Sequence, residues 1–405
     1  MNGRKLLLLG GSDQQIIAIK TAKRLGYQTV LCDYLRDNPG QYHVDRFYLE
    51  STTDKDAVLK VAKAEGIDGV LAYASDPAAP TAAYVAEKLG LPGNPYESVR
   101  ILCEKDLFRQ FLREHGFCTP AARGYSSIKD AEKDIMTGCF KLPVVVKPVD
   151  SSGSKGVFRI DAGCVEKTRY FLNKSMSYSR AKRVIVEEWV EKHGYQIAGD
   201  GMSIDGKLVF RCFGSDHFNP LCENPYVPVS ASFPSDLPEN VQEIVHGTIQ
   251  RLITELGMGT CTYNFDIRID KDCNVYLMEV APRAGGNYIP DVVRYATGIN
   301  LTEYCVRSAM GEKISSPDVI EPEGFWSYYA VHSLQSGILD SIEIKDPFKD
   351  KVIENHLIKH SGDHVFSFTE ANTSLGCLIM KFSSMHEMHS MMDHSEQWIT
   401  VHVKK

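Results

Sequence analysis

The sequence predicts an α/β protein of two or three domains, and three observations support this prediction. At 405 residues the chain is too long for one ordinary hydrophobic core. Strand-like and helix-like stretches alternate from residue 5 to about residue 95, which is typical of a doubly wound parallel sheet. After about Gly311 the pattern changes to short strands, which indicates a small C-terminal domain of mixed α/β type.

Composition excludes several classes of partner. An apolar content of 43% and a charged content of 24% are those of a soluble globular protein. The net charge of −7 and the absence of a dense Lys/Arg block argue against nucleic acid or an anionic membrane as partner. No apolar stretch approaches transmembrane length. The eleven scattered cysteines lack C-x-x-C spacing, so we expect free thiols and a cytoplasmic location.

The N-terminal elements follow one another regularly. Strands are expected at 5–9, 29–32, 46–49 and 70–72, and helices at 13–25, 54–65 and 77–89. The turn after the first strand, at Gly11 and Ser12, leads into a helix and could cradle an anion. Because the G-x-G-x-x-G fingerprint is absent, we expect this turn to bind part of a small substrate rather than a dinucleotide.

The central stretch of the chain is a strand that ends on a lysine and a loop of small residues. Valines at 144–146 predict a buried strand that ends at Lys147, and a strand-like pattern resumes at Val157. Small residues let backbone N–H groups approach an anion, and hydroxyls add donors. The spacing is not that of a Walker A loop. We expect a flap that can close over phosphates, and a solvated hairpin is the alternative.

A second informative stretch, at 264–287, folds as a hairpin when its turn is centred between Asp272 and Cys273. This register predicts one apolar face formed by the pairs Phe265–Val280, Ile267–Met278 and Ile269–Tyr276. It also places Asp266 opposite Glu279 on the other face. Like charges directly across a hairpin are unfavourable unless a cation lies between them, and Mg²⁺ takes one or two carboxylates plus phosphates. Two solvated acids that tolerate each other are the alternative.

The remaining predicted helices and strands bear less directly on function. Further helices are expected at 98–115, 239–256 and 384–394, and further strands at 183–190, 196–204, 207–213, 326–334, 338–344, 376–382 and 398–403. Within 214–233, Ser215, Asp216, His217 and Tyr226 are polar or aromatic candidates for substrate contacts, and ordinary loop residues are the alternative.

The order of these stretches resembles the ATP-grasp superfamily over nearly the whole chain. The shared features are the lysine-ended strand with its flap, a strand that ends at 187–190, and an acid pair followed by Arg283. The resemblance is to the carboxylate–amine ligase branch, with similarity to biotin carboxylase, carbamoyl-phosphate synthase and purine-pathway enzymes. It implies an N-terminal α/β domain at 1–95, an ATP-grasp domain of two antiparallel sheets at 96–311 with a mobile lid at about 118–190, and a C-terminal domain at 312–405.

The resemblance also implies roles for individual residues. Those that would contact or cover the nucleotide are Lys105, Lys147, Ser151, Ser152, Gly153, Ser154, Gly156, Glu187, Glu188, Trp189, Val190 and Gln196. Among them, Glu187 and the backbone of Val190 would bind adenine, and Gln196 competes with Glu191 for the ribose.

Other residues would act at the reacting end. Asp266 and Glu279 would hold Mg²⁺ or Mn²⁺, although the asparagine often found two residues after the second acid is Ala281 here. Arg283 and Lys147 would be catalytic, since Arg283 could stabilise the transferred phosphoryl group. Substrate contacts are expected at Gly11, Ser12, His217, Gly285, Gly286 and Asn287.

The implied activity is that of an ATP-dependent carboxylate–amine ligase. A small, amino-acid-like carboxylate would attack the γ-phosphate to give an acyl phosphate, and an amine would then displace phosphate. A carboxylase or carbamoyl-transfer enzyme that acts on bicarbonate or a phosphoribosyl intermediate is one alternative, and a nucleotide-binding module without catalysis is another. The expected partners are small molecules, with no nucleic acid and no membrane, and a homodimer is compatible with the resemblance.

Overall fold

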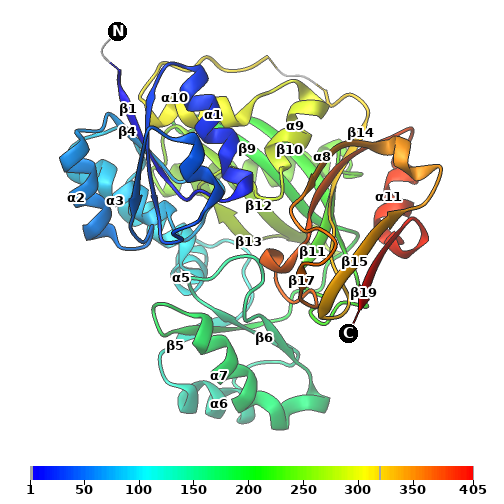
Figure 1. Cartoon of the computed structure of the whole chain (residues 1–405). Coiled ribbons are helices and arrows are strands. Elements are labelled where there is room, and N and C mark those ends of the chain that lie inside the picture. The colour runs from blue at the N-terminus through cyan, green and yellow to red at the C-terminus, as the bar shows by residue number, and fades with distance from the viewer. Residues whose placement is uncertain (1–2, 319–320, 405) are drawn as a thin grey trace.

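The computed structural model describes residues 3–318 and 321–404, and its mixed α/β architecture confirms the predicted fold class (Figure 1). The chain opens with a parallel sheet in the order β3-β2-β1-β4. Its strands are β1 (Lys5–Leu9), β2 (Gln28–Asp33), β3 (Arg46–Leu49) and β4 (Gly69–Leu71), and its helices are α1 (Ile16–Arg24), α2 (Lys55–Glu65) and α3 (Ala79–Leu89). Leu6 to Leu9 are almost fully buried, as expected for a parallel strand covered on both faces. The predicted alternation of strands and helices is therefore confirmed.

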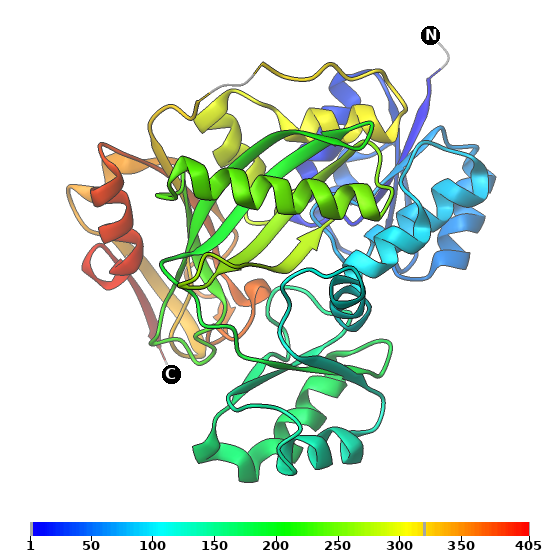
Figure 2. The ribbon, with the colours of Figure 1, turned by 180° about the vertical axis from the view of Figure 1, so that it is seen from behind.

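A small antiparallel sheet projects from the body of the molecule (Figures 1 and 2). Its order is β5-β8-β6-β7, formed by β5 (Ala122–Tyr125), β8 (Val184–Glu188), β6 (Val144–Pro148) and β7 (Phe158–Ile160). Helices α6 (Ile128–Met136) and α7 (Thr168–Tyr178) cover one face, where the buried valines of β6 and β8 pack. The helices α4 (Tyr96–Cys103) and α5 (Lys105–Glu114) precede this sheet. We call this projecting unit the lid.

An eight-stranded sheet forms the body, in the order β13-β12-β9-β10-β11-β14-β18-β16. Its strands are β9 (Gln196–Ile204), β10 (Lys207–Phe218), β11 (Pro228–Phe233), β12 (Cys261–Ile269), β13 (Val275–Ala281), β14 (Phe325–Ala330), β16 (Val352–Leu357) and β18 (Gly376–Phe382). Helix α8 (Glu239–Glu255) lies across one face (Figure 2). Helix α9 (Ile289–Thr297) packs on the other, and α10 (Leu301–Ala309) packs on the N-terminal sheet.

The C-terminal segment continues this sheet. Strands β14, β18 and β16 extend it directly, whereas β17 (His364–Val365), β15 (Gly337–Ile344) and β19 (Ile399–Lys404) form a separate three-stranded sheet beside α11 (Met385–Asp393). The domain borders at 95 and 311 remain a proposal. In the described residues, no helix has both the length and the apolar character that crossing a membrane requires. The eleven cysteines are all free.

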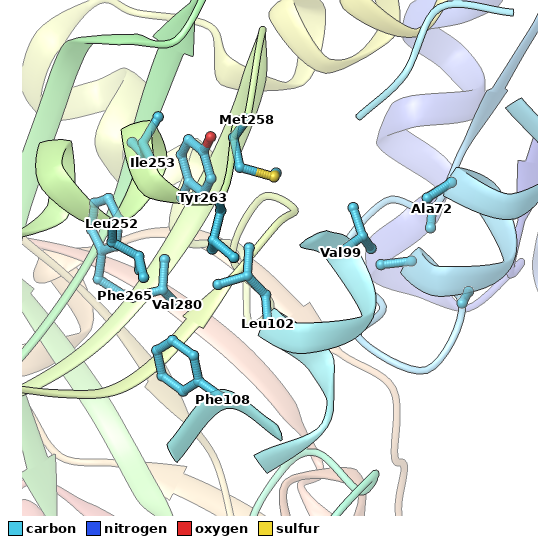
Figure 3. Packing of buried hydrophobic residues seen from close by; sticks show 14 of the residues in the cluster. Ala72, Val99, Leu102, Phe108, Leu252, Ile253, Met258, Tyr263, Phe265 and Val280 are labelled. Carbon is cyan, nitrogen blue, oxygen red and sulfur yellow. The ribbon is translucent and has the colours of Figure 1, made fainter. Parts of the chain in front are cut away.

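The core that fixes the acid-bearing strands is shown in Figure 3. Phe265 of β12 and Val280 of β13 pack in one cluster with Leu252 of α8 and with Leu102 and Phe108 of α4 and α5. Phe265 and Val280 are 2% and 0% exposed. Because successive strand residues point to opposite faces, burying these two side chains directs their neighbours Asp266 and Glu279 to the opposite face of the sheet.

The predicted hairpin register is right at the acid pair and wrong beyond it. Phe265 pairs with Val280 and Asp266 with Glu279, as predicted. The register then shifts, so that Ile267 pairs with Leu277, and Ile269 pairs with Val275 rather than with Tyr276. The extra residue is Met278, which forms a β-bulge and lines a cavity instead of the core.

Strand β10 is longer than predicted. The strand expected at 207–213 continues to Phe218, because Ser215 and Asp216 pair with β9 on one side and with β11 on the other. Their polar side chains interrupt the apolar pattern from which the strand was predicted. Asp216 and His217 therefore lie in a regular strand of the large sheet and not in a loop.

Candidate functional site

Two adjoining cavities meet at Asp266 and Glu279. The first, of about 450 Å³, lies between the lid and the large sheet, and we call it the lid cavity. The second, of about 460 Å³, lies where the N-terminal sheet, the large sheet and the C-terminal segment meet, and we call it the junction cavity. Asp216, Asp266, Glu279 and flap residues 152–155 line both. The acid pair therefore stands between two spaces, each large enough for a small molecule.

Lys147 is held in the lid cavity by a buried ion network. Its ammonium group contacts the carboxylate of Glu187, whose other oxygen accepts a hydrogen bond from Arg109 Nε at 3.0 Å. Arg109 also donates to the carbonyl oxygens of Leu277 and Met278, at 3.0 and 2.9 Å. Burial would raise the pKa of Glu187, but Arg109 and Lys147 outweigh burial and lower this pKa to about 2. Arg109 thus connects α5, the lid and the bulge of β13.

This network changes the interpretation of Glu187. Its side chain is 1% exposed and both of its oxygens are engaged, so we assign it to positioning Lys147 rather than to binding adenine. The side chain of Glu188 is also occupied, because its Oε1 accepts from the backbone N–H of Lys141 at 2.7 Å.

Arg268, which sequence reasoning missed, organises the far end of the lid cavity. Its Nη1 donates to the carbonyl oxygen of Val190 at 3.0 Å, and its Nε donates to Oε1 of Gln196 at 2.8 Å. Its guanidinium carbon lies 4.4 Å from the Trp189 ring centroid, and that of Arg159 lies 4.5 Å from the same centroid. The amide nitrogen of Gln196 donates to Asp216 Oδ2 at 3.1 Å. Gln196 is therefore engaged at both ends, and Trp189 is held as a wall of the cavity.

The flap is closed against the C-terminal half of the chain. The carbonyl oxygen of Gly153 accepts from the backbone N–H of Ala371 at 3.1 Å, and Ser154 Oγ donates to the carbonyl oxygen of Tyr226 at 3.2 Å. Gly153 and Gly156 have φ values of +64° and +70°, a region that favours glycine. Lys105 Nζ donates to the carbonyl oxygen of Ser151 at 2.7 Å. The predicted flap residues at 151–154 therefore line the lid cavity together with Lys105 and Lys147, whereas Gly156 lies against Pro148 and Tyr178 and does not line it.

The acid pair has the features of a site for a hard cation. Oδ1 of Asp266 is buried and has no hydrogen-bond partner among the described residues. Burial raises the pKa of Asp266 to about 6, and the charge of Glu279 adds to this rise. In the part of the chain that the structure describes, no group of three His, Cys, Asp or Glu side chains could hold a metal. Mg²⁺ fits this pair, with water and phosphate oxygens as its other ligands.

Arg283 forms a bidentate ion pair with Asp76, which sequence reasoning also missed. Its Nε and Nη2 donate to the two carboxylate oxygens of Asp76, both at 2.7 Å. Burial would raise the pKa of Asp76, but Arg283 lowers it. Lys105 Nζ lies 3.4 Å from Glu279 Oε2. Burial would lower the pKa of Arg283, but the charges of Asp76 and Glu279 raise it, so both cations lie near the acid pair. Arg283 lines the junction cavity as predicted, but its guanidinium is fixed by Asp76.

The predicted substrate residues divide into three groups. Ser12, Gly286 and Asn287 line the junction cavity. The backbone N–H groups of Gly11 and Gly285 are engaged, because they donate to carboxylate oxygens of Asp33 and Asp200 at 2.8 and 2.9 Å. His217 lines the lid cavity and not the junction cavity. It is fixed there by Asp393 and Ser232, each at 2.6 Å from a ring nitrogen.

The Arg109 network predicts a large loss of stability when its cation is removed. Arg109→Met leaves Glu187 buried with one cation fewer and two carbonyl groups without donors, so we expect the free energy of unfolding to fall by about 3–5 kcal/mol. Arg113→Met is the matched control, because Arg113 lies one turn later on α5 and is exposed. Urea denaturation measures both variants. A loss for Arg109→Met within 1 kcal/mol or so of the control would contradict the assignment.

The raised pKa of Asp266 predicts that the stability of the metal-free protein depends on pH. Its folded-state pKa, about 6, lies above the ordinary value of 3.8, so the ionised carboxylate destabilises the fold above about pH 6, and this cost disappears below about pH 4. Asp266→Asn should therefore raise the melting temperature at about pH 8 and leave it unchanged at about pH 4, with a gain of about 1–3 kcal/mol at the higher pH. The exposed turn residue of the same hairpin supplies the control, Asp272→Asn. A lower melting temperature for Asp266→Asn at pH 8 would refute this expectation.

Comparisons with known proteins place the chain in a family. Residues 19–93 match the ATP-grasp N-terminal domain and residues 140–291 match the ATP-grasp domain. The formate-dependent phosphoribosylglycinamide formyltransferase of Saccharolobus solfataricus is 26% identical over 328 residues, which span 78% of each chain. The uncharacterized protein y4rH of Sinorhizobium fredii is 29% identical over 270 residues, which are 65% of this chain and 54% of y4rH. The chain thus spans about half the length of that relative.

Solved structures share the fold. An L-amino acid ligase from Bacillus licheniformis superimposes with a TM-score of 0.80 at 21% identity, and a phosphoribosylglycinamide synthetase from Anaerococcus prevotii with 0.75 at 22%, each covering 100% of both chains. The biotin carboxylase domain of 2-oxoglutarate carboxylase from Hydrogenobacter thermophilus, in complex with MgADP and bicarbonate, has a TM-score of 0.74 at 15% identity, covering 98% of this chain and 90% of that domain. Since the two matched family regions together make up more than half of the sequence, the chain belongs to the ATP-grasp superfamily.

Proposed function

We propose that the protein is an ATP- and Mg²⁺-dependent ligase that joins a small, amino-acid-like carboxylate to an amine and releases ADP and phosphate. The observation that carries this proposal is the half-buried pair of Asp266 and Glu279, which face each other between two cavities. Membership of the ATP-grasp superfamily supports an ATP site, and a structural neighbour was solved with MgADP. A site for one nucleotide and an adjoining site for a second substrate is the arrangement that phosphoryl transfer to a carboxylate requires.

In this proposal the lid cavity takes the nucleotide. Lys105 and Lys147 contact its phosphates, with Glu187 and Arg109 holding Lys147 in place. The base lies against the wall formed by Trp189, Val190 and Met278. Mg²⁺, when bound at the acid pair, neutralises charge on the phosphates. The remaining polar flap residues, Ser151, Ser152 and Ser154, cover the phosphates with Gly153 and Gly156.

The chemistry consists of two displacements. A carboxylate oxygen in the junction cavity attacks the γ-phosphorus, the bond from that phosphorus to the ADP oxygen breaks, and an acyl phosphate forms. The amine nitrogen then attacks the acyl carbon, phosphate leaves, and the nitrogen loses a proton as the amide forms. Lys105, Lys147 and the Asp76-bound Arg283 stabilise the negative charge. The flap, which is closed in this structure, excludes water from the acyl phosphate.

A carboxylase or a phosphoribosyl-directed enzyme is the second candidate, favoured by the similarity to phosphoribosylglycinamide formyltransferase. The junction cavity argues against a phosphoribosyl substrate. The lysine, arginine and histidine side chains that line it are Lys155, Arg283 and His356. Arg283 is bound to Asp76 and His356 contacts Glu354 at 2.7 Å, so Lys155 is the cation available to a phosphate. A phosphate group is ordinarily held by several convergent cations and N–H donors.

Three further features are proposals. We propose that the chain divides into an N-terminal domain at 1–95, an ATP-grasp domain at 96–311 and a C-terminal domain at 312–405. We also propose a cytoplasmic location and a homodimeric assembly. Limited proteolysis tests the domain borders, and sedimentation of the purified protein tests the assembly.

The proposed activity predicts ADP release that depends on a carboxylate. The purified protein is incubated with ATP, Mg²⁺ and hydroxylamine, and ADP and hydroxamate are measured for amino acids, bicarbonate and formate in parallel. We expect amino acids to give both products. Asp266→Asn and Glu279→Gln should each lower the rate at least about 100-fold, and Asp272→Asn should leave it unchanged. Turnover with bicarbonate or formate alone would favour the second candidate, and ATP binding without any turnover would contradict a ligase.

A further inference from the structure

The buried carboxylate of Asp216 is not used by the proposed reaction. It is 6% exposed and lines both cavities. Its Oδ2 accepts one hydrogen bond, from the Gln196 amide at 3.1 Å. No lysine, arginine or histidine within the described ranges forms an ion pair with it, whereas Asp76 and Glu187 both have cationic partners. A buried carboxylate without a cation is costly unless a ligand supplies one.

Asp216 does not complete the metal site. The described residues contain no group of three His, Cys, Asp or Glu side chains that could hold a metal ion. Asp216, Asp266 and Glu279 therefore do not form a three-carboxylate metal site in the described residues. A different positive group has to approach it from one of the two cavities.

The sheet register shows where Asp216 lies relative to the acid pair. Asp266 pairs with Ala198, and Asp216 pairs with Gln196, two residues along the same strand β9. Directly paired residues share a face, and so do residues two apart, so Asp216 and Asp266 point to the same side of the sheet. They lie two strands apart, which is roughly 10 Å between backbones. Ala198 lies on the strand between them, has a small side chain and lines the junction cavity.

The junction cavity, of about 460 Å³, is lined by both Asp266 and Asp216. A substrate whose carboxylate lies beside Asp266 can therefore place another group of the same molecule near Asp216. The rest of the junction cavity is lined by both polar and apolar residues, and its apolar or aromatic walls include Val227, Ile289 and Tyr328. A cationic group on the α-carbon would meet Asp216, and an apolar side chain would meet these walls.

We propose that Asp216 binds the α-ammonium group of the amino acid whose carboxylate is activated, so that the donor substrate is an α-amino acid with an apolar side chain. This inference rests on the proposed ligase function and adds a specificity-determining residue to it. The competing role for Asp216 is to bind the ribose hydroxyls of ATP, because it also lines the lid cavity.

The test compares amino acids with their deaminated analogues. ADP release is measured with L-alanine and propionate, L-leucine and 4-methylpentanoate, and L-phenylalanine and 3-phenylpropionate, each with hydroxylamine as acceptor. For at least the leucine and phenylalanine pairs, the wild-type kcat/KM should favour the amino acid by about 10- to 100-fold, the range for a hydrogen bond between charged groups. Asp216→Asn should reduce this preference to a kcat/KM ratio between about 1 and 3, and it should leave the KM for ATP unchanged. Asp205→Asn, at the exposed turn between β9 and β10, should keep the wild-type preference.

Each other outcome overturns the inference in a recognisable way. A wild-type enzyme that uses amino acids and deaminated analogues equally contradicts it while leaving the ligase function intact, and this result needs no variant to fold. An increased KM for ATP in Asp216→Asn, with the amino-acid preference retained, assigns Asp216 to the nucleotide. Absence of turnover with every carboxylate refutes both the ligase function and the inference that rests on it.

Discussion

The structure depends on two carboxylates, Asp266 and Glu279, that are held opposite each other against their mutual repulsion. Their neighbours Phe265 and Val280 are buried in the largest core cluster, so the hairpin cannot rotate either acid away without exposing a core residue. Hydrophobic burial on one face of the sheet thus stabilises an electrostatically unfavourable pair on the other. The unpartnered Oδ1 of Asp266 indicates that the arrangement is completed by something outside the chain.

Around this pair, buried ion networks connect parts of the chain that are far apart in sequence. Arg109 joins α5 to Glu187 in the lid and to the bulge of β13, and Arg283 joins the end of the hairpin to Asp76 beside the N-terminal sheet. Such networks contribute little net stability compared with apolar packing, but removing one partner is costly. They therefore fix the positions of Lys147 and Arg283 relative to the acid pair, which is the precision that charge stabilisation in catalysis requires.

The sequence alone was enough to predict the features that a local residue pattern determines. The valine run before Lys147, the Ser/Gly flap and the alternation around Asp266 follow the periodicity of a strand or the composition of a loop, and each lies where it was predicted. Partners in tertiary contact were missed. Arg109 meets Glu187 across 78 residues, Arg268 meets Gln196 across 72 and Arg283 meets Asp76 across 207, and no local pattern relates such positions. The bulge at Met278 was missed because an apolar residue fits the core face of a regular hairpin equally well. The strand around Asp216 was missed because its polar residues interrupt the apolar pattern, although the strand is paired on both edges.

In the proposed mechanism, one divalent cation and the phosphates of ATP meet between Asp266 and Glu279. The most direct measurement is a crystal structure of the protein with Mg²⁺ and a non-hydrolysable ATP analogue. We expect a metal ion bound by oxygens of both carboxylates and of the terminal phosphates, with Lys105 and Lys147 on the phosphates and the base beside Trp189. A nucleotide bound elsewhere, or phosphates with no metal contact to either acid, would contradict it.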